Sequence, residues 1–234
     1  MTRQPEAAPR APLSRDRVLR AAVALADSTG IEALSMRRLA QELGVVPMAL
    51  YKHVAHKEEL LDGMVETVVG EIGPPAPGTG WRAAVRLRIL SARTALLGHP
   101  WAAQVIRSRT GPTPAVLAHL DAVIGTFRAG GLSADLTHHA MHALGSRVLG
   151  FTQEVFDAAP GPAPQGPAIL PPEAAAAYPH VAELAMAAAH DGDSVVGGGC
   201  DDRFEFEFAL DLLLEGFERL HRQGWTSAGG GVAG

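Results

Sequence analysis

Side chains that donate hydrogen bonds gather at two places within the first 60 residues. Arg37 and Arg38 stand side by side near the start of a short segment with helical apolar spacing. A second group follows after a short interval: Tyr51, Lys52, His53 and Lys57. Such donors bind phosphate oxygens, and an arginine can also donate two parallel hydrogen bonds to guanine. The pattern therefore indicates contact with the backbone of a DNA duplex.

Other reactive side chains give weaker patterns. His138 and His142 are four residues apart and could share a metal ion, but residues 138–142 lack the glutamate that a metalloprotease helix uses as base. Exposed histidines, or histidines lining a ligand pocket, are the favoured interpretation. Cys200 is the only cysteine, which excludes an intramolecular disulfide and a multi-cysteine zinc site. We expect no metal and no cofactor.

Enzymatic motifs are missing as well. The sequence has no Gly-x-Ser-x-Gly elbow, no phosphate-binding glycine loop and no dinucleotide fingerprint. We therefore expect that the protein is not an enzyme, and a helical-bundle enzyme is the least favoured alternative.

The composition favours helices. Of the 234 residues, 47% are hydrophobic and 19% are charged, as in a globular protein, while only 5% are aromatic. Alanine is abundant, and no long stretch alternates apolar with polar residues as a strand would. The sequence predicts an all-α fold.

Charge is distributed unevenly along the chain. Residues 1–60 hold nine Lys/Arg against seven Asp/Glu, whereas the remainder holds eleven against eighteen. Only the first part is thus compatible with phosphate contact. No apolar run has the roughly 20 residues that a membrane-spanning helix needs, and the start has no hydrophobic signal segment. We expect a cytoplasmic protein without a membrane partner.

Three short helices are predicted before residue 55. Ser14 and Ser35 are N-cap candidates for helices over 14–30 and 35–43, and Gly30 and Gly44 stand where those helices end. Pro47 fits the first position of a third helix, over 47–54. The tight turn between the second and third helices is typical of a helix-turn-helix, although a plain three-helix core without a DNA role would show the same apolar spacing.

The remaining chain reads as a helical bundle. A longer helix from residue 57 ends at the Pro/Gly segment 73–78, the best candidate for a domain hinge. Further helices are expected at 81–97, 101–107, 114–129, 133–157, 172–190 and 204–222, with flexible loops at 160–172 and 191–202. The predicted organisation is an arm (1–13), a helix-turn-helix domain with its connecting helix (14–73), a ligand-binding and dimerisation domain (79–224) and a flexible tail (225–234).

The last predicted helix has an apolar seam. Its members recur at alternating spacings of four and three residues: Phe206, Leu210, Leu213, Phe217 and Leu220. Such a seam requires a partner helix. We predict a subunit interface there, with burial inside the protein's own bundle as the alternative.

Four segments carry a resemblance to a known family: 30–40 (GIEALSMRRLA), 43–45 (LGV), 49–54 (ALYKHV) and 57–61 (KEELL). Together they resemble the DNA-binding domain of the tetracycline-repressor (TetR) family of bacterial transcription regulators. Weaker landmarks, among them Trp81 and residues 131–133, extend the likeness toward the tetracycline repressor's own subfamily. The resemblance implies an all-helical homodimer with a helix-turn-helix head on each subunit and a small-molecule pocket in the body, in which ligand binding releases the operator.

Candidate DNA contacts follow from this resemblance. Four residues correspond to base-reading positions: Arg37, Pro47, Met48 and Ala49. Five correspond to phosphate contacts: Ser35, Tyr51, Lys52, His53 and Lys57. Because Met48 and Ala49 offer only apolar contact, we expect little direct base readout by the third helix. For Tyr51, a role in helix packing is the alternative.

Candidate ligand contacts follow in the same way. The corresponding positions are Arg88, Ala92, Ile106, Arg109, Leu120, Val123, His138, Met141 and Glu154. The subfamily's magnesium-tetracycline ligand is not expected, because its metal-binding histidine is replaced by Ile106 and only Glu154 matches its ligand set. Each apolar member of this set could equally be core. A largely apolar organic ligand is the better prediction.

The sequence as a whole thus predicts a ligand-responsive DNA-binding transcription regulator. It would be a repressor, released from a pseudo-palindromic operator by a small organic effector. The alternative is a constitutive or architectural DNA-binding protein without an effector.

Overall fold

The structure, a computed structural model, describes residues 12–74, 78–150, 172–187 and 202–229, and all regular elements in these ranges are helices. The predicted all-α fold is confirmed. None of these helices is long and apolar enough to cross a membrane. Residues 1–11 of the predicted arm, Glu154 and most of the two predicted flexible loops lie outside the described residues.

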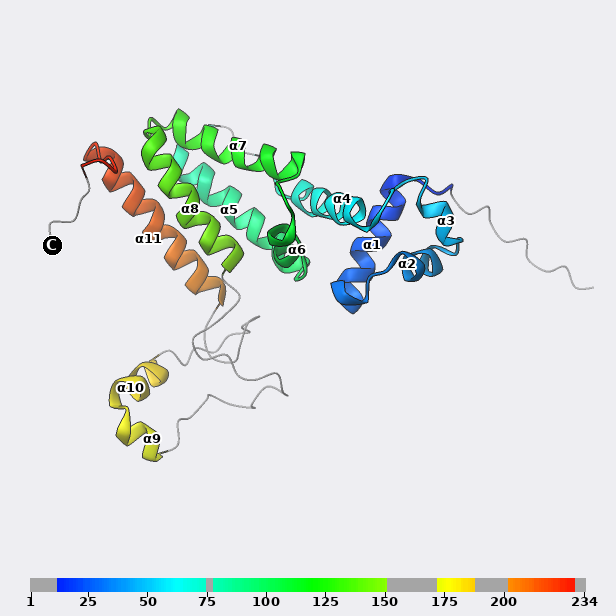
Figure 1. Cartoon of the computed structure of the whole chain (residues 1–234). Helices are drawn as coiled ribbons and strands as arrows, with labels where there is room; N and C mark the ends of the chain where they lie inside the picture. The colour runs from blue at the N-terminus through cyan, green and yellow to red at the C-terminus, as the bar shows by residue number, and fades with distance from the viewer. Residues whose placement is uncertain (1–11, 75–77, 151–171, 188–201, 230–234) are drawn as a thin grey trace, which may run out of the picture. The chain divides into compact units, whose positions relative to one another are not determined.

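The helices follow one another along the chain as Figure 1 shows. The first are α1 (Arg15–Thr29), the short 3-10 helix η1 (Ile31–Ala33), α2 (Met36–Leu43), α3 (Pro47–Leu50) and α4 (Lys57–Gly70). Next come α5 (Trp81–Gly98), α6 (Ala102–Ser108), α7 (Pro114–Ala129) and α8 (Ala134–Gly150). The last are α9 (Pro172–Ala177), α10 (Pro179–Ala187) and α11 (Asp202–Arg222).

The helices form two compact units that divide the chain differently from the predicted domains. The first unit holds the described residues up to 74 together with 91–122, and the second holds 78–90 and the described residues from 123 onward. The boundary had been expected at the Pro/Gly segment 73–78 alone. It differs because α6 packs against α4 and so joins the N-terminal helices.

Capping residues fix the ends of the first helices as the sequence predicted. The Oγ atoms of Ser14 and Ser35 accept hydrogen bonds from the backbone N–H groups of Arg17 and Arg38, each at 3.2 Å. Gly44 ends α2 in the left-handed region at φ 66°, which a residue with a Cβ adopts only at a cost. The chain therefore turns sharply into α3, whose first residue is Pro47.

The first unit is built around the packing of α1 against α2 and α4. Val18, Leu39, Leu50, Leu60 and Met64 are completely buried between these helices. Removing this apolar surface from water is the main force that holds the three-helix arrangement together. As a result α2 and α3 have a fixed position on α1 and α4.

The second unit packs α8 and α11 side by side (Figure 1) over the first half of α5. Phe127, Leu136, Phe206 and Leu210 lie in its core. Two arginines of α5 pair with acidic residues of α11: Arg82 with Glu215 and Glu218, and Arg86 with Glu207 and Asp211. These pairs fix the register of α11 on α5.

Two predicted helices differ in extent from the observed ones. The helix predicted over 47–54 is four residues of α3 followed by a turn. Of the helix predicted over 133–157, α8 spans Ala134–Gly150, and residues 151–157 lie outside the described residues. The predicted helix 172–190 is two helices, because Tyr178 separates α9 from α10 and Pro179 begins the latter.

Candidate nucleic-acid interface and cavity

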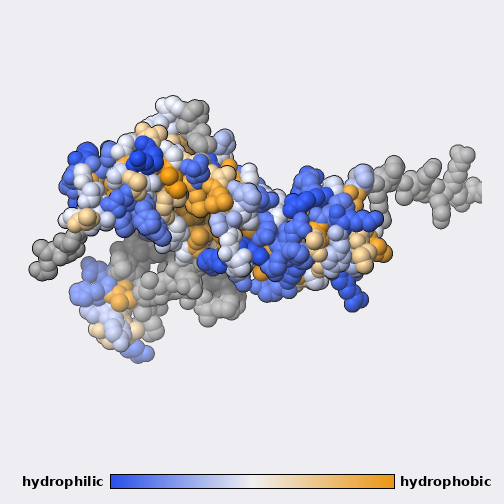
Figure 2. All heavy atoms as spheres, turned by 45° about the horizontal axis from the view of Figure 1, so that its top comes forward, coloured by the Kyte–Doolittle hydropathy of each residue, from blue (hydrophilic) through white to orange (hydrophobic). Residues whose placement is uncertain are grey.

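An exposed surface forms where α2 turns into α3. Met48 is 71% exposed and Val46 is 67% exposed, whereas Leu50 of the same helix is completely buried. Apolar side chains reach the surface elsewhere too (Figure 2), but here they stand at the start of a four-residue helix. Val46 was not among the predicted contacts, and its place directly before Pro47 in the turn is the signal that could have found it.

The predicted polar contacts stand on the elements next to this surface: α2, the turn after α3 and the start of α4. Arg37, Lys52 and Lys57 are exposed. Tyr51 is 46% exposed, so it is not the buried helix-packing residue of the alternative interpretation. Pro47 is exposed and Ala49 and His53 are half-buried. Exposed basic, hydroxyl and apolar side chains on a helix-turn-helix suit phosphate contact together with limited base contact.

Caps hold the donors in place at both sides of this surface. Ser35 accepts a hydrogen bond through its Oγ at the start of α2, so its own O–H remains a donor. At the start of α4, His56 Nδ1 accepts from the Glu59 N–H at 3.1 Å, and Glu59 Oε2 accepts from the Ala55 N–H at 2.7 Å. These bonds orient the first turn of α4, which carries Lys57. The capping role of His56 was not predicted.

A cavity of about 180 Å³ lies within the first unit, between α4 and the segment that joins α6 to α7. Its lining includes Val65, Ile106, Arg109, Pro112, Thr113 and Val116. Two of the predicted ligand residues, Ile106 and Arg109, are therefore in one cavity. Ile106 has no oxygen or nitrogen with which to hold magnesium.

Arg109 connects this cavity to α4. Its Nη2 pairs with Glu58, and its Nε lies 2.9 Å from Asp62 Oδ1 as an ion pair without the alignment of a hydrogen bond. The Arg109 side chain is only 10% exposed. Its hydrogen bond and charge hold the pKa of Glu58 below the ordinary value.

Known proteins with the same pattern are found for both parts of the chain. The protein-family model described as "Bacterial regulatory proteins, tetR family" matches residues 18–64. The model described as "Tetracyclin repressor-like, C-terminal domain" matches residues 74–221. The chain belongs to the TetR family. The resemblance drawn from the sequence is confirmed.

Individual TetR-family relatives differ in how much of their length is matched. The transcriptional repressor DrrR1 of Streptomyces coeruleorubidus is 40% identical over 133 residues, which are 56% of this chain and 49% of DrrR1. The chain thus spans about half the length of that relative. The class G tetracycline repressor of Vibrio anguillarum is 30% identical over 213 residues, 89% of this chain and 95% of the relative.

Solved TetR-family structures match most of the chain. Crystal structures of Streptomyces coelicolor ActR, in complex with (S)-DNPA and with actinorhodin, give TM-scores of 0.67 and 0.66 at 28% and 29% identity. They cover 90% and 89% of this chain and 100% and 98% of the ActR chains.

The other predicted ligand residues of this TetR-family chain are not in the cavity described above. Ala92 is buried in the first unit and Val123 in the core of the second, while Leu120 is exposed. Arg88 is buried, and the loss of water around its guanidinium lowers its pKa. Met141 is half-buried and His138 is exposed.

The histidines of α8 form an exposed ring cluster in the second unit of the TetR chain. The ring of His138 lies 4.6 Å from that of His142 and 5.2 Å from that of His139, measured between centroids. Within the described ranges, no group of three or more His, Cys, Asp or Glu residues is arranged to hold a metal ion. The expectation that the protein binds no metal stays a prediction.

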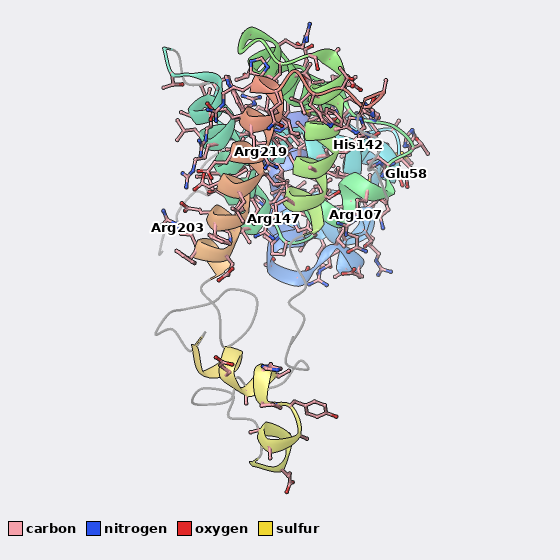
Figure 3. All side chains as sticks on the ribbon, turned by 90° about the vertical axis from the view of Figure 1, so that its left-hand side faces the viewer. Glu58, Arg107, His142, Arg147, Arg203 and Arg219 are labelled. Carbon is pink, nitrogen blue, oxygen red and sulfur yellow. The ribbon has the colours of Figure 1, made fainter. Side chains whose placement is uncertain are left out.

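The structure corrects the predicted subunit seam on α11. Phe206, Leu210 and Phe217 are buried in the core of their own unit. The guanidinium of Arg147 of α8, which is labelled in Figure 3, lies over the Phe206 ring, 5.1 Å from its centroid. Their burial by the chain's own helices leaves them little surface for a second subunit. Leu213 and Leu220 are half-buried against the same core. The alternative, burial within the bundle, is the correct one for the three buried residues.

A different face of α11 is open. Phe204, Phe208 and Leu212 follow one another at four-residue intervals and each is more than half exposed. The rings of Phe204 and Phe208 stack at 6.3 Å between centroids. Since an apolar stripe of this size on an otherwise charged helix is a typical interface feature, it replaces the buried seam as the candidate dimer surface.

A polar cluster that the sequence analysis missed ties three parts of the first unit together. His99, in the turn between α5 and α6, has its Nδ1 2.9 Å from Asp27 Oδ1 of α1 and its Nε2 3.2 Å from Glu71 Oε2 at the end of α4. Trp101 Nε1 also donates to Asp27, at 2.6 Å. Burial alone would lower the pKa of His99, but the hydrogen bonds and charges of the two carboxylates outweigh it and raise the pKa above the ordinary value. Asp27 and Glu71 are 72 and 28 residues from His99 in the sequence, so no local sequence pattern could predict these contacts.

Proposed function

We propose that this TetR-family protein is a transcriptional repressor that a small organic effector releases from its operator. The observation that carries the proposal is the position of the cavity: Val65 of α4 is in its wall, and Arg109 connects it to the first turn of that helix. The same turn follows the helix-turn-helix directly and carries Lys57. A ligand that moves Arg109 can therefore change the position of a DNA-contacting side chain.

Relatives support the two halves of this proposal. DrrR1 is a transcriptional repressor by name, and ActR has been crystallised with (S)-DNPA and with actinorhodin. We propose that the protein acts without catalysis and works in the cytoplasm. As a homodimer it would present two identical heads to a pseudo-palindromic site.

The effector we propose is partly apolar and carries one polar or ionisable group. Ile106, Val65 and Val116 supply the apolar wall, and Arg109 and Thr113 supply polar atoms. Pockets of this kind bind organic molecules by apolar contact and fix their orientation with a few polar groups.

A two-step experiment tests the function. Duplexes that bind the protein are first selected from a random DNA pool, and compounds are then screened by thermal shift and titrated against the selected duplex. We expect a pseudo-palindromic site and at least one stabilising compound that lowers operator affinity by roughly 5- to 150-fold. If stabilising compounds leave operator affinity unchanged, the protein is a constitutive DNA-binding protein.

A further inference from the structure

Arg109 pairs with two carboxylates of α4 and also lines the cavity. Its guanidinium pairs with Glu58 in the first turn of α4 and with Asp62 one turn further on, and its side chain also lines the cavity. Because the Arg109 side chain contacts both the cavity and α4, a ligand that binds in the cavity can change the contacts of that helix.

The three partners differ strongly in exposure. The Arg109 side chain is 10% exposed, whereas those of Glu58 and Asp62 are 62% and 46% exposed. A buried guanidinium needs an anion beside it, because water cannot solvate it there. The exposed carboxylates can return to water at little cost, and ion pairs of exposed groups are weak. Another anion that reaches Arg109 from the cavity side can therefore replace them.

The size of the cavity limits what that anion can be. Its volume is about 180 Å³, and its apolar wall includes Val65, Ile106 and Val116. A cavity of about 150 Å³ with an apolar lining holds benzene. The cavity thus fits a single apolar ring, and Arg109 at its edge fits a carboxylate on that ring.

From these contacts we propose that Arg109 is an anion-gated latch: an organic acid with one apolar ring enters the cavity, pairs with the Arg109 guanidinium and releases Glu58 and Asp62. The inference rests on the proposed function and names its ligand class. Without Arg109, the first turn of α4 keeps its His56 cap but loses its tie to α6. Lys57, beside Glu58 in that turn, then loses its fixed position toward DNA.

Calorimetry with matched probes tests the latch on the full chain. The probes are benzoate and cyclohexanecarboxylate, with benzamide and cyclohexanecarboxamide as neutral counterparts of the same shape. We expect the acids to bind more tightly than the amides. In the double variant Glu58→Gln/Asp62→Asn, which removes the competing charges and keeps Arg109, acid affinity should rise at least ~5-fold while amide affinity stays the same.

Arg109→Gln should abolish the preference for acids, and Arg20→Gln is its matched control. Arg20 also forms an ion pair in the first unit, with Asp16, but both side chains are exposed and outside the cavity lining. Because the double variant predicts a gain of affinity, loss of folding cannot imitate it. The latch is wrong if the acids bind no better than the amides, if neither binds, or if the double variant does not gain affinity for the acids.

Operator titration separates this inference from the proposed function. With an open latch, the double variant should bind the selected operator more weakly than the parent and respond less to benzoate. If the double variant keeps parental operator affinity and a full response to a compound from the screen, the latch fails and the repressor function stands. If benzoate binds as expected but no ligand changes operator affinity, the release step and the proposed function both fail.

Discussion

At the scale of single residues, the polar side chains proposed to contact DNA divide into one that can read a base by hydrogen bonds and several that can only bind the backbone. Arg37 is exposed on α2, beside the N-cap Ser35, and its guanidinium can donate to guanine. Lys57 stands at the first position of α4 as a point charge. Replacing Arg37 and replacing Lys57 should therefore change DNA binding in different ways.

Arg37→Ala should lose roughly 1 to 3 kcal/mol of discrimination at one base pair in each half-site. Lys57→Ala should weaken binding to every sequence alike and reduce the slope of log affinity against log salt by about 1. Fluorescence anisotropy with the selected operator and a scrambled duplex, at several salt concentrations, distinguishes the two. Equal losses on both duplexes for Arg37→Ala would remove it from the base-reading set.

His99 should make the stability of the first unit depend on pH. Its pKa is raised in the folded protein by Asp27 and Glu71, so it binds a proton more tightly when folded than when unfolded. The stability it contributes is complete below the ordinary histidine pKa of about 6.5 and is lost as the pH rises through the raised value.

The free energy of unfolding of the parent should accordingly fall, relative to that of His99→Gln, as the pH rises above the ordinary histidine pKa of about 6.5. Urea unfolding at intermediate pH values measures the difference. His180→Gln removes an exposed histidine of α10 and should leave the pH dependence unchanged. Parallel pH profiles for the parent and His99→Gln would show that the cluster does not hold a proton in this range.

At the scale of elements, α11 has two apolar faces with different tasks. Phe206 and Phe208 are two residues apart, yet the first is completely buried and the second is more than half exposed. The buried face packs in the core of its own unit, and the exposed face is the surface that we propose for a second subunit.

Phe208→Asp should yield monomers that keep their helical content, because it places a charge in the exposed stripe and leaves the core intact. Phe206→Ala should instead lower the free energy of unfolding by about 3 to 5 kcal/mol through the cavity it leaves. Light scattering reports the first effect and urea unfolding the second. An unchanged dimer for Phe208→Asp would mean that this stripe is not the interface.

At the scale of the whole molecule, effector and operator must influence each other equally. If an effector lowers operator affinity by some factor, the bound operator lowers effector affinity by the same factor, typically 5- to 150-fold. Titrating the effector into the free protein and into the operator complex gives both numbers. Unequal factors would show that a third state, such as the dissociated monomer, takes part.

The amino-acid sequence by itself determined the local structure and the family. Ser14, Ser35, Gly44 and Pro47 marked the helix ends because capping, left-handed φ and a missing N–H are properties of single residues. The helix-turn-helix therefore followed from neighbours in the chain, and Arg109 was already a candidate for the pocket.

The tertiary structure decided which surfaces those helices use. Both faces of α11 are apolar, so periodicity could not say which one is buried; packing against α5 and α8 settled it. Glu58 and Arg109 are 51 residues apart, and only the packing of α6 on α4 made them a pair. Local propensity acts over a few residues, whereas the partner of a buried charge is set by the tertiary packing of residues that are far apart in the sequence.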